Sequence, residues 1–358
     1  MPVFSRLGGH EQVVFGHDPA SGLRCIIAIH STALGPALGG TRMYPYATEE
    51  EALEDVLRLS QGMTYKAACA GLDLGGGKAV IIGDPATDKS EVLLRAYGRM
   101  VESLGGRYVT ACDVGTTPAD LSLVGRETRW ATGGLAQEGG SGDSGIMTAH
   151  GVHLGVRATA KRAFGDADLT DLHVAVLGLG KVGGRLVESL LEDGARVTVA
   201  DIREEATDRF AGHGRVDVVS VDELPLVEAD ILSPNALGGL LTEELVDELQ
   251  VRAVCGGANN QLATPKVGQL LHEAGILYAP DFVVNAGGLI SVSDELHPGG
   301  WSAERVRSRA ERIDDTLQEI FDEAEASDEP TAVAANIVAE RRIERVGGLR
   351  RTWLPPRH

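Results

Sequence analysis

Basic residues are in short supply in this sequence. Its 358 residues contain 33 Lys and Arg against 52 Asp and Glu, which gives a formal net charge of −19 at pH 7. Binding to the phosphate backbone of DNA or RNA requires clustered Lys and Arg. We therefore expect no nucleic-acid partner.

Long apolar runs are also missing. No stretch of about 18 uncharged apolar residues is present to cross a bilayer. The N-terminal sequence reads MPVFSRLGGHEQVVF and lacks both the basic region and the apolar region of a secretory signal. We expect no membrane partner and no secretory signal.

Cysteine is scarce, and its four positions are scattered: Cys25, Cys69, Cys112 and Cys255. Because they form no C-x-x-C pair, neither a zinc ribbon nor a disulfide framework is indicated, and we expect no metal site. Reduced, buried thiols in a cytoplasmic protein are the favoured interpretation.

The residues that are present describe a globular protein of more than one core. A hydrophobic fraction of 43% with 24% charged residues is ordinary for a soluble chain, and 358 residues predict two domains. The 46 glycines indicate many tight turns or close backbone approaches.

The first part of the chain alternates between strand and helix patterns. Strands are predicted at 23–31, 78–83 and 107–113, with helices at 48–70 and 90–106. Thr48 and the acidic residues after it are typical of a helix start. This order predicts an α/β layer.

Three domain segments follow from the composition. Residues 131–145 hold six glycines without apolar periodicity, which indicates a hinge or an interdomain cleft loop. We therefore predict a substrate-binding and oligomerisation domain at 1–145, a nucleotide-binding domain at 146–325, and a C-terminal helical segment and tail at 326–358. Within these, 301–327 reads as one long charged amphipathic helix and 347–358 as a tail.

A dinucleotide-binding pattern opens the second domain. Gly178, Gly180 and Gly183 form G-x-G-x-x-G directly after the predicted strand 173–177, and Asp201 ends the next strand. The glycines allow a tight turn and a close approach to a pyrophosphate at the helix N-terminus. Lys181 and Val182 lie within this predicted cofactor loop.

Asp201 bears on the choice of cofactor. A carboxylate here accepts hydrogen bonds from the adenosine ribose and repels a 2′-phosphate, so NAD is favoured over NADP. Arg203, two residues later, leaves the choice open, because an arginine nearby accommodates a 2′-phosphate.

Asparagines follow several of the later apolar strands: Asn235, Asn259, Asn260 and Asn285. In an open parallel sheet, ligands bind at the carboxyl ends of the strands, so these residues are candidates to line the cofactor crevice. The alternative for each one is a turn-forming role, since asparagine side chains bond to the local backbone.

Lys66 and Lys78 stand twelve residues apart in a glycine-rich apolar segment. A lysine that stays charged can hold a carboxylate, while a partly desolvated lysine beside it can give up its proton and act as a base. Asp113 is a candidate second proton carrier. In the alternative interpretation, Lys66 reaches solvent from its helix and Lys78 merely pairs with Asp73 or Asp113.

Several motifs occur together and in a characteristic order: HSTALGPALGGTR, GMTYKAACAGLDLGGGKAVI, VTACDVGT, VLGLGKVG, CGGANNQLA and LYAPDFVVNAGG. From about residue 8 to about residue 345 the sequence resembles the Glu/Leu/Phe/Val amino-acid dehydrogenase superfamily, and its valine-specific, branched-chain members most. The resemblance implies an N-terminal α/β substrate domain, a Rossmann-type doubly wound NAD-binding domain, and an active site in the cleft between them. It also implies reversible oxidative deamination of an apolar L-amino acid with NAD, and a homo-oligomer.

The resemblance also implies roles for single residues. Lys66, helped by Gly39 and Gly40, matches the position that binds the substrate carboxylate. Lys78 matches the catalytic lysine that activates water, and Asp113 the aspartate that carries protons.

Further positions match the cofactor and side-chain sites. One of Asn259 and Asn260 is expected to contact the substrate or the nicotinamide ribose, and Thr148 and Asn285 match positions near the nicotinamide carboxamide. The side-chain pocket matches Leu38, Ala111, Leu289 and Val292, which are all apolar. A glutamate side chain has no cationic partner there, so glutamate is disfavoured.

Two alternatives remain at this point: a dehydrogenase for phenylalanine or another aromatic amino acid, and an NAD-binding protein without turnover. Leu289 stands where several relatives have valine, and we expect it to narrow the pocket in favour of valine. Asp73 stands where many relatives have asparagine. A carboxylate there, if it faced the pocket, would favour the protonated form of Lys78 and move the alkaline pH optimum upward.

Overall fold

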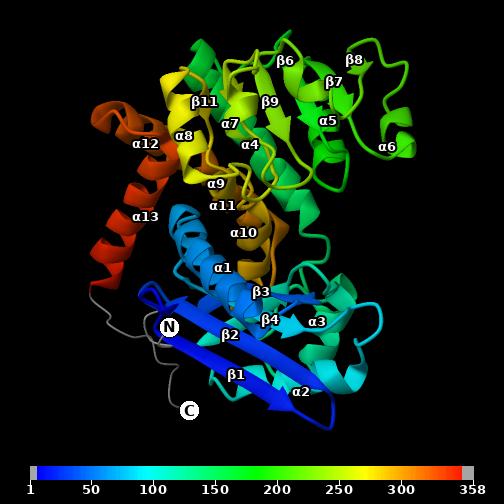
Figure 1. Cartoon of the computed structure of the whole chain (residues 1–358), viewed down its shortest axis with the longest axis vertical. Helices are drawn as coiled ribbons and strands as arrows, with labels where there is room; N and C mark the ends of the chain where they lie inside the picture. Colours follow the sequence, from blue (N-terminus) through cyan, green and yellow to red (C-terminus); the bar gives the residue numbers. More distant parts are fainter. Residues whose placement is uncertain (1–5, 349–358) are drawn as a thin grey trace. The chain divides into compact units, whose positions relative to one another are not determined.

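The computed structural model describes residues 6–348. They form two compact units, which we describe separately. The first unit runs to Ser144 and includes Ser291–Ala303 and the chain from Ala339 on; the second comprises Gly145–Ile290 and Glu304–Val338. Each unit is built on its own β-sheet (Figure 1).

The sheet of the first unit has five strands in the order β1-β2-β4-β3-β5. They are β1 (Gln12–Asp18), β2 (Leu23–Ser31), β3 (Ala37–Tyr44), β4 (Gly75–Ile82) and β5 (Tyr108–Cys112). The pairs β1–β2 and β2–β4 are antiparallel, whereas β3 pairs in parallel with both β4 and β5. The strands predicted at 23–31, 78–83 and 107–113 are confirmed as β2, β4 and β5.

Helices cover both faces of this sheet (Figure 1). On one face α1 (Glu49–Cys69) buries its apolar side against Val80 and its neighbours; on the other lie α2 (Glu91–Glu102) and α3 (Pro118–Val124). Thr48 caps α1, as predicted, by accepting a hydrogen bond from the Glu51 amide at 3.1 Å. A Cβ at Gly76 would lie 2.1 Å from the Thr64 nitrogen, so this glycine lets α1 approach β4 closely.

The second sheet has six parallel strands in the order β11-β10-β9-β6-β7-β8. They are β6 (His173–Leu177), β7 (Arg196–Ala200), β8 (Val216–Val218), β9 (Ile231–Pro234), β10 (Ala253–Val254) and β11 (Leu277–Tyr278). Numbered within the sheet, this is the 3-2-1-4-5-6 order of the Rossmann fold. The predicted doubly wound second domain is thereby confirmed.

In the described chain ten helices follow Ser144, and the first five of them lie beside this sheet (Figure 1). In chain order they are α4 (Gly145–Phe164), α5 (Gly183–Glu192), α6 (Glu204–Asp208), α7 (Glu243–Val246), α8 (Pro265–Glu273), α9 (Asp281–Val284), α10 (Gly287–Asp294), α11 (Ala303–Ala310), α12 (Arg312–Ser327) and α13 (Thr331–Gly347). Helices α10, α11 and α13 each extend across a boundary between the units. Two short 3₁₀ turns complete the described chain, at Ala136–Glu138 and Leu224–Leu226.

The long helix predicted at 301–327 is wrong in one respect, because the segment forms two helices. At Glu311 the hydrogen bonding changes from a four-residue step, Glu311 to Arg307, to a three-residue step, Asp314 to Glu311. Such a tightened turn interrupts the helix without changing its apolar periodicity, so the sequence pattern does not reveal it. The second piece packs on α4, as the contact between the Gln318 amide nitrogen and the Ala158 carbonyl shows (3.1 Å).

The glycine-rich segment 131–144 is held within the first unit. Both carboxylate oxygens of Glu295 accept a hydrogen bond from the Gly133 amide, at 3.0 and 2.9 Å, and one of them also accepts from the Ser141 amide at 2.7 Å. This side chain therefore fixes a loop in which the sequence shows no apolar periodicity.

The remaining general expectations concern cysteines, membranes and the tail. Cys25, Cys69 and Cys255 are buried, Cys112 is half-buried, and all four are free thiols. In the part of the chain that the structure describes, no helix has the length and apolar content needed to span a membrane. The tail predicted from residue 347 falls, from 349 on, outside the described residues.

Candidate active site

Lys78 lies on β4 and is 6% exposed, which is unusual for a lysine. Its Nζ contacts Oδ2 of Asp113 at 2.7 Å. Asp113 directly follows β5, so two strands separated in sequence by about thirty residues bring these groups together. A buried ammonium and carboxylate in contact can exchange and hold protons, which surface pairs rarely do.

Asp113 has a second cationic partner, Arg42, whose Nε lies 3.1 Å from the same Oδ2 atom. Burial by itself raises the pKa of the Asp113 carboxyl, but the charges of Lys78 and Arg42 outweigh it and lower the pKa to about 2. At neutral pH the carboxylate is therefore ionised.

Two glycines of β3 make room for these groups. A Cβ at Gly39 would lie 1.7 Å from the Gly77 carbonyl oxygen, and a Cβ at Gly40 would lie 2.9 Å from the Asp113 Cβ. Any larger residue would displace the backbone next to Lys78 or the side chain of Asp113. The two glycines thus lie beside the lysine–aspartate pair, where the neighbouring strands leave no space for a larger side chain.

Lys66 occupies the last turn of α1 and is half-exposed. It belongs to the same unit as Lys78, and the close approach of α1 to β4 at Gly76 brings its helix end toward the strand that carries Lys78. A lysine ammonium at such a position is a suitable partner for a small carboxylate.

Asp73 points away from the lysines. Its side chain is 84% exposed and pairs with Arg342 of α13 at 3.1 Å. The condition under which Asp73 would influence Lys78, a position facing the pocket, is therefore not met. Lys78 pairs with Asp113 rather than with Asp73.

The predicted side-chain pocket positions are all buried. In the first unit Leu38 is 0%, Ala111 6% and Val292 9% exposed, and in the second unit Leu289 is 7% exposed. Strand β3 alternates its side chains, so Leu38, Gly40 and Arg42 share one face. Gly40 is paired with Ala111 of β5 on that face.

The glycine loop after β6 has the three features of a dinucleotide-binding turn. Gly178 has a φ of 91°, a conformation that favours glycine, and a Cβ at Gly183 would lie 1.9 Å from the Gly178 carbonyl oxygen. A Cβ at Gly180, in contrast, would have no heavy atom within 4 Å. Gly180 is exposed and is followed by exposed Lys181 and by Val182, the residue before the first turn of α5.

Asp201 is hydrogen-bonded to the backbone of this loop. One of its carboxylate oxygens accepts a hydrogen bond from the Leu179 amide at 2.6 Å, and the other accepts from the backbone and the Nε of Arg203 at 2.9 and 3.1 Å. Burial raises the pKa of this carboxyl, but the hydrogen bonds from Arg203 and Leu179 outweigh it, and the pKa is lowered. Arg203, 56% exposed, is thereby engaged by the residue that was expected to select the cofactor.

The asparagines fall into two groups. Asn285 is 3% exposed, and its Nδ2 donates to Oδ1 of Asn259 at 2.8 Å and to the Gly257 carbonyl at 3.1 Å. Asn235 also binds this segment, since its Oδ1 accepts from the Gly257 amide at 2.9 Å. The structure thus joins three of the four candidates at the strand ends.

Asn260 differs from the other asparagines. It is exposed, its φ is 53°, and its carbonyl accepts from the Gly239 amide at 2.7 Å. This is the turn-forming behaviour that the sequence left open for each asparagine. Thr148 lies in the first turn of α4, where a Cβ at Gly287 would come within 3.1 Å of its nitrogen.

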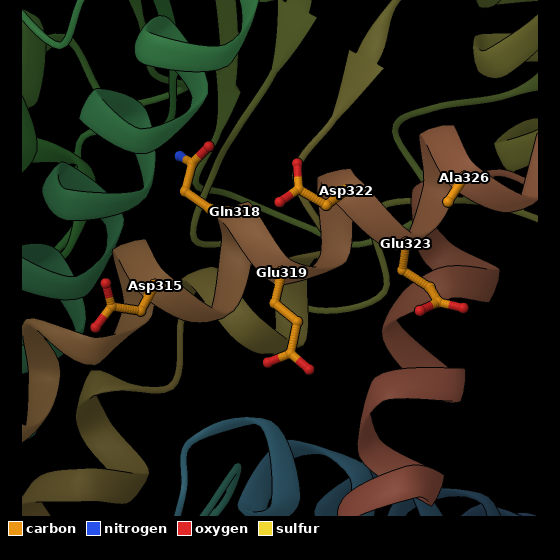
Figure 2. Close-up of a pocket in the computed structure, with 6 residues that line it drawn as sticks. All are labelled: Asp315, Gln318, Glu319, Asp322, Glu323 and Ala326. Carbon is orange, nitrogen blue, oxygen red and sulfur yellow. The ribbon is translucent and has the colours of Figure 1, made fainter.

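A hollow of about 530 Å³ elsewhere in the second unit does not have the chemistry of a substrate site (Figure 2). It runs along α12, and its lining residues are Asp315, Gln318, Glu319, Asp322, Glu323 and Ala326. Four carboxylates repel the carboxylate of an amino acid. Within residues 6–348, no group of three or more His, Cys, Asp or Glu is arranged to hold a metal ion.

Arg42 is the site residue that sequence reasoning missed. Its Nη1 contacts Oδ2 of Asp55 at 2.8 Å while its Nε contacts Asp113, so it joins two carboxylates. A signal was present in the sequence: Arg42 stands two residues after Gly40, and residues two apart on a strand share a face.

Comparisons with known proteins agree with this arrangement. Residues 10–130 match the family model described as Glu/Leu/Phe/Val dehydrogenase, dimerisation domain, and residues 198–349 match the model Glutamate/Leucine/Phenylalanine/Valine dehydrogenase. Valine dehydrogenase from Streptomyces virginiae is 56% identical over 340 residues, covering 94% of each chain. Leucine dehydrogenase from Geobacillus stearothermophilus is 48% identical over 349 residues, covering 98% of this chain and 95% of the relative.

A solved structure is similar as well. L-tryptophan dehydrogenase from Nostoc punctiforme superposes with a TM-score of 0.84 at 43% identity, covering 96% of this chain and 98% of that one. The two family models, the high identities over nearly the whole length and the shared two-domain fold give one conclusion: the chain belongs to the Glu/Leu/Phe/Val dehydrogenase family of amino-acid dehydrogenases.

Proposed function

We propose that the protein catalyses the reversible, NAD-dependent oxidative deamination of a branched-chain L-amino acid. In the forward direction the amino acid, water and NAD⁺ give the 2-oxo acid, ammonium, NADH and a proton. The observation that carries the proposal is the buried Lys78–Asp113 pair at 2.7 Å in a chain 56% identical to a valine dehydrogenase.

The residues of the first unit have distinct tasks in this proposal. The Lys66 ammonium pairs with the substrate carboxylate, and Gly39 and Gly40 are the proposed backbone contacts of the same group. Lys78 Nζ accepts a proton from the substrate amino group, releases it to solvent, and then accepts a proton from the attacking water. Asp113 orients Lys78 and stabilises its ammonium form, since it is already ionised at neutral pH.

The residues of the second unit fit a nicotinamide dinucleotide. Gly178 and Gly183 allow the tight turn before α5, Gly180 leaves open space for the pyrophosphate, and Asp201 would accept the ribose hydroxyls. Thr148, Asn259 and Asn285 are the proposed contacts of the nicotinamide end. When bound, the cofactor supplies the oxidation by taking a hydride from the substrate α-carbon.

The substrate class follows from the pocket positions. Leu38, Ala111 and Val292 of the first unit are buried and apolar, and so is Leu289 of the second unit. Apolar residues at these positions support a branched aliphatic substrate side chain and disfavour glutamate, whose charge would need a cationic partner. Leu289 is bulkier than valine, which supports small branched substrates over phenylalanine.

The test is NADH formation at alkaline pH, followed at 340 nm with a panel of L-amino acids. We expect kcat/KM for valine and leucine to exceed that for phenylalanine by about tenfold or more, because the phenyl ring is larger than a pocket for a branched aliphatic side chain, and glutamate to give no measurable rate. A clear preference for phenylalanine would overturn the substrate class. Failure of every amino acid to reduce NAD⁺, with the cofactor still bound, would overturn the function.

The location and assembly are part of the same proposal. Four free cysteines, three of them buried, agree with a reducing, cytoplasmic environment. Strand β1 forms one edge of the first sheet and exposes Phe15 to 60%, a surface that a second copy of the chain would cover. The first unit also matches a model described as a dimerisation domain, and we propose a homo-oligomer.

Cofactor choice is tested by Asp201→Asn, which keeps a side-chain oxygen for the Leu179 amide but removes the negative charge. With the charge gone, Arg203 is released from its ion pair and becomes available to a 2′-phosphate. We expect the ratio of kcat/KM with NAD⁺ to kcat/KM with NADP⁺ to fall by about tenfold or more. The double variant Asp201→Asn/Arg203→Gln should recover part of the NAD⁺ preference; an unchanged ratio in both would exclude Asp201 as the selector.

A further inference from the structure

Arg42 lies between two carboxylates on the face of the first sheet that α1 covers. It is opposite Val80 in the pairing of β3 with β4, and Val80 packs against α1. Lys78 stands two residues before Val80, so its side chain emerges on the same face. Strand register alone thus places Arg42 and Lys78 on one side of the sheet, next to Asp113.

Two cationic side chains contact one and the same carboxylate oxygen of Asp113. Lys78 Nζ at 2.7 Å and Arg42 Nε at 3.1 Å approach the same oxygen, Oδ2. Deprotonation of a lysine that is the only partner of a buried carboxylate costs much free energy, because it leaves that carboxylate unpaired. Here the carboxylate keeps a permanent cation when Lys78 becomes neutral, since arginine does not titrate in proteins.

The guanidinium is itself held in place. Its Nη1 contacts Asp55 Oδ2 at 2.8 Å, and that carboxylate also accepts from the Tyr46 hydroxyl at 2.6 Å and from Arg58 at 2.9 Å. Arg42 is 23% exposed and bridges α1 to the end of β5. The contact of Nη1 with Asp55 therefore holds the guanidinium in the orientation in which Nε contacts Asp113.

The other titratable group near Asp113 stays neutral. Tyr108 is buried and donates its hydroxyl to the Gly39 carbonyl at 2.7 Å, and burial raises its pKa to about 12. Tyr46 beside Asp55 is also shifted upward, by burial and by the hydrogen bond to that carboxylate. Lys78 and Asp113 are thus left as the pair whose proton balance Arg42 can control.

We propose that Arg42 is a positioning residue that keeps Asp113 ionised and paired throughout the reaction, so that Lys78 can release its proton and act as the base. This inference rests on the proposed function, because it assigns Arg42 a task only if Lys78 is the base. Arg42 does not touch the reacting atoms; it acts through Asp113.

The test compares pH profiles of kcat/KM for oxidative deamination in wild type and Arg42→Gln. Without the second cation, deprotonation of Lys78 leaves Asp113 unpaired, so we expect the acid limb of the profile to move to higher pH by about one unit. Arg42→Lys keeps a positive charge but lacks the planar guanidinium group. The acid limb of its pH profile should lie between those of wild type and Arg42→Gln. Both carboxylates keep another partner in Arg42→Gln, namely Lys78 for Asp113 and Tyr46 for Asp55, so we expect the variant to fold.

Two further variants separate positioning from a general structural role. Arg58→Gln removes a cation from Asp55 but none from Asp113, and its profile should overlay that of wild type. In Asp113→Asn, adding Arg42→Gln should shift the profile no further, because the group through which Arg42 acts is already neutral.

The outcomes distinguish the two levels of the proposal. A Lys78→Ala variant as active as wild type would overturn the proposed base, and this inference with it. An inactive Lys78→Ala together with an unshifted Arg42→Gln, or an Arg42→Gln effect that persists in Asp113→Asn, would overturn only the role of Arg42. If Arg42→Gln does not fold, Arg42→Lys takes its place in the cycle, with the same expected sign and a smaller shift.

Discussion

Replacing Lys78 by alanine is expected to lower kcat for oxidative deamination by about a thousandfold, within the range that loss of a general base produces. The physical reason is that Nζ of Lys78 is the buried amine that can take protons from substrate and water, and it contacts Asp113 at 2.7 Å. The fold should persist, because Asp113 retains Arg42 as its partner. The measurement is the initial rate of NADH formation, with circular dichroism to verify folding.

A matched control is present in the same unit. Lys89 also pairs with an aspartate, Asp120, at 2.9 Å, but that pair belongs to the start of α3 and not to the site. Lys89→Ala should therefore keep kcat within about twofold, although losing a partly buried pair lowers stability. If Lys78→Ala and Lys89→Ala lost activity to the same extent, the loss would be structural and the assignment of the base would fail.

The second large effect concerns the cofactor. Gly180→Ala should weaken NADH binding by at least about tenfold, because the new methyl group occupies the space in which the backbone approaches the pyrophosphate. The folded protein has no heavy atom within 4 Å of that methyl position, so the melting temperature should not change. Titration of protein fluorescence with NADH gives the Kd without requiring turnover.

Two other glycines provide control variants for Gly180→Ala. Gly214 belongs to the same unit and is equally open to a methyl group, but it lies outside the loop, so Gly214→Ala should leave both the Kd and the melting temperature unchanged. At Gly183 the methyl group would come 1.9 Å from the Gly178 carbonyl oxygen, so Gly183→Ala should lower both stability and affinity. Normal NADH binding by Gly180→Ala would show that the loop does not hold the pyrophosphate.

The fold of the second unit was largely readable from the sequence because its signals are local. The strand His173–Leu177, the glycine turn and the helix from Gly183 follow one another within twenty residues, and each has its own pattern of periodicity and glycine. Helix α1 was equally readable, since Thr48 and the acidic first turn mark its start. Local patterns failed at Glu311, where a one-residue change of hydrogen bonding divides a periodic segment into two helices.

The candidate site could be predicted only in part from local sequence patterns. The motifs single out Lys66, Lys78 and Asp113 by residue type and order, but spacing along the chain does not say which charges meet. Asp73 and Asp113 were both possible partners of Lys78, and the structure decides for Asp113, while Asp73 turns to Arg342 on the surface. Arg42 carried a weak signal, because its importance depends on two contacts that involve α1 and the end of β5.

By itself the sequence determined the chemistry available to this protein. It shows an acidic chain, two α/β domains, a dinucleotide turn, a pair of lysines in a glycine-rich segment, and the candidate proton carrier Asp113 after a later strand. These properties are encoded in short stretches whose residues are neighbours in the chain. Only the tertiary structure decided which charged groups share an oxygen, which lysine is buried, and which aspartate points to solvent. The physical reason is that Coulomb interactions and desolvation depend on distance and burial, and the packing of α1, β3, β4 and β5 sets both.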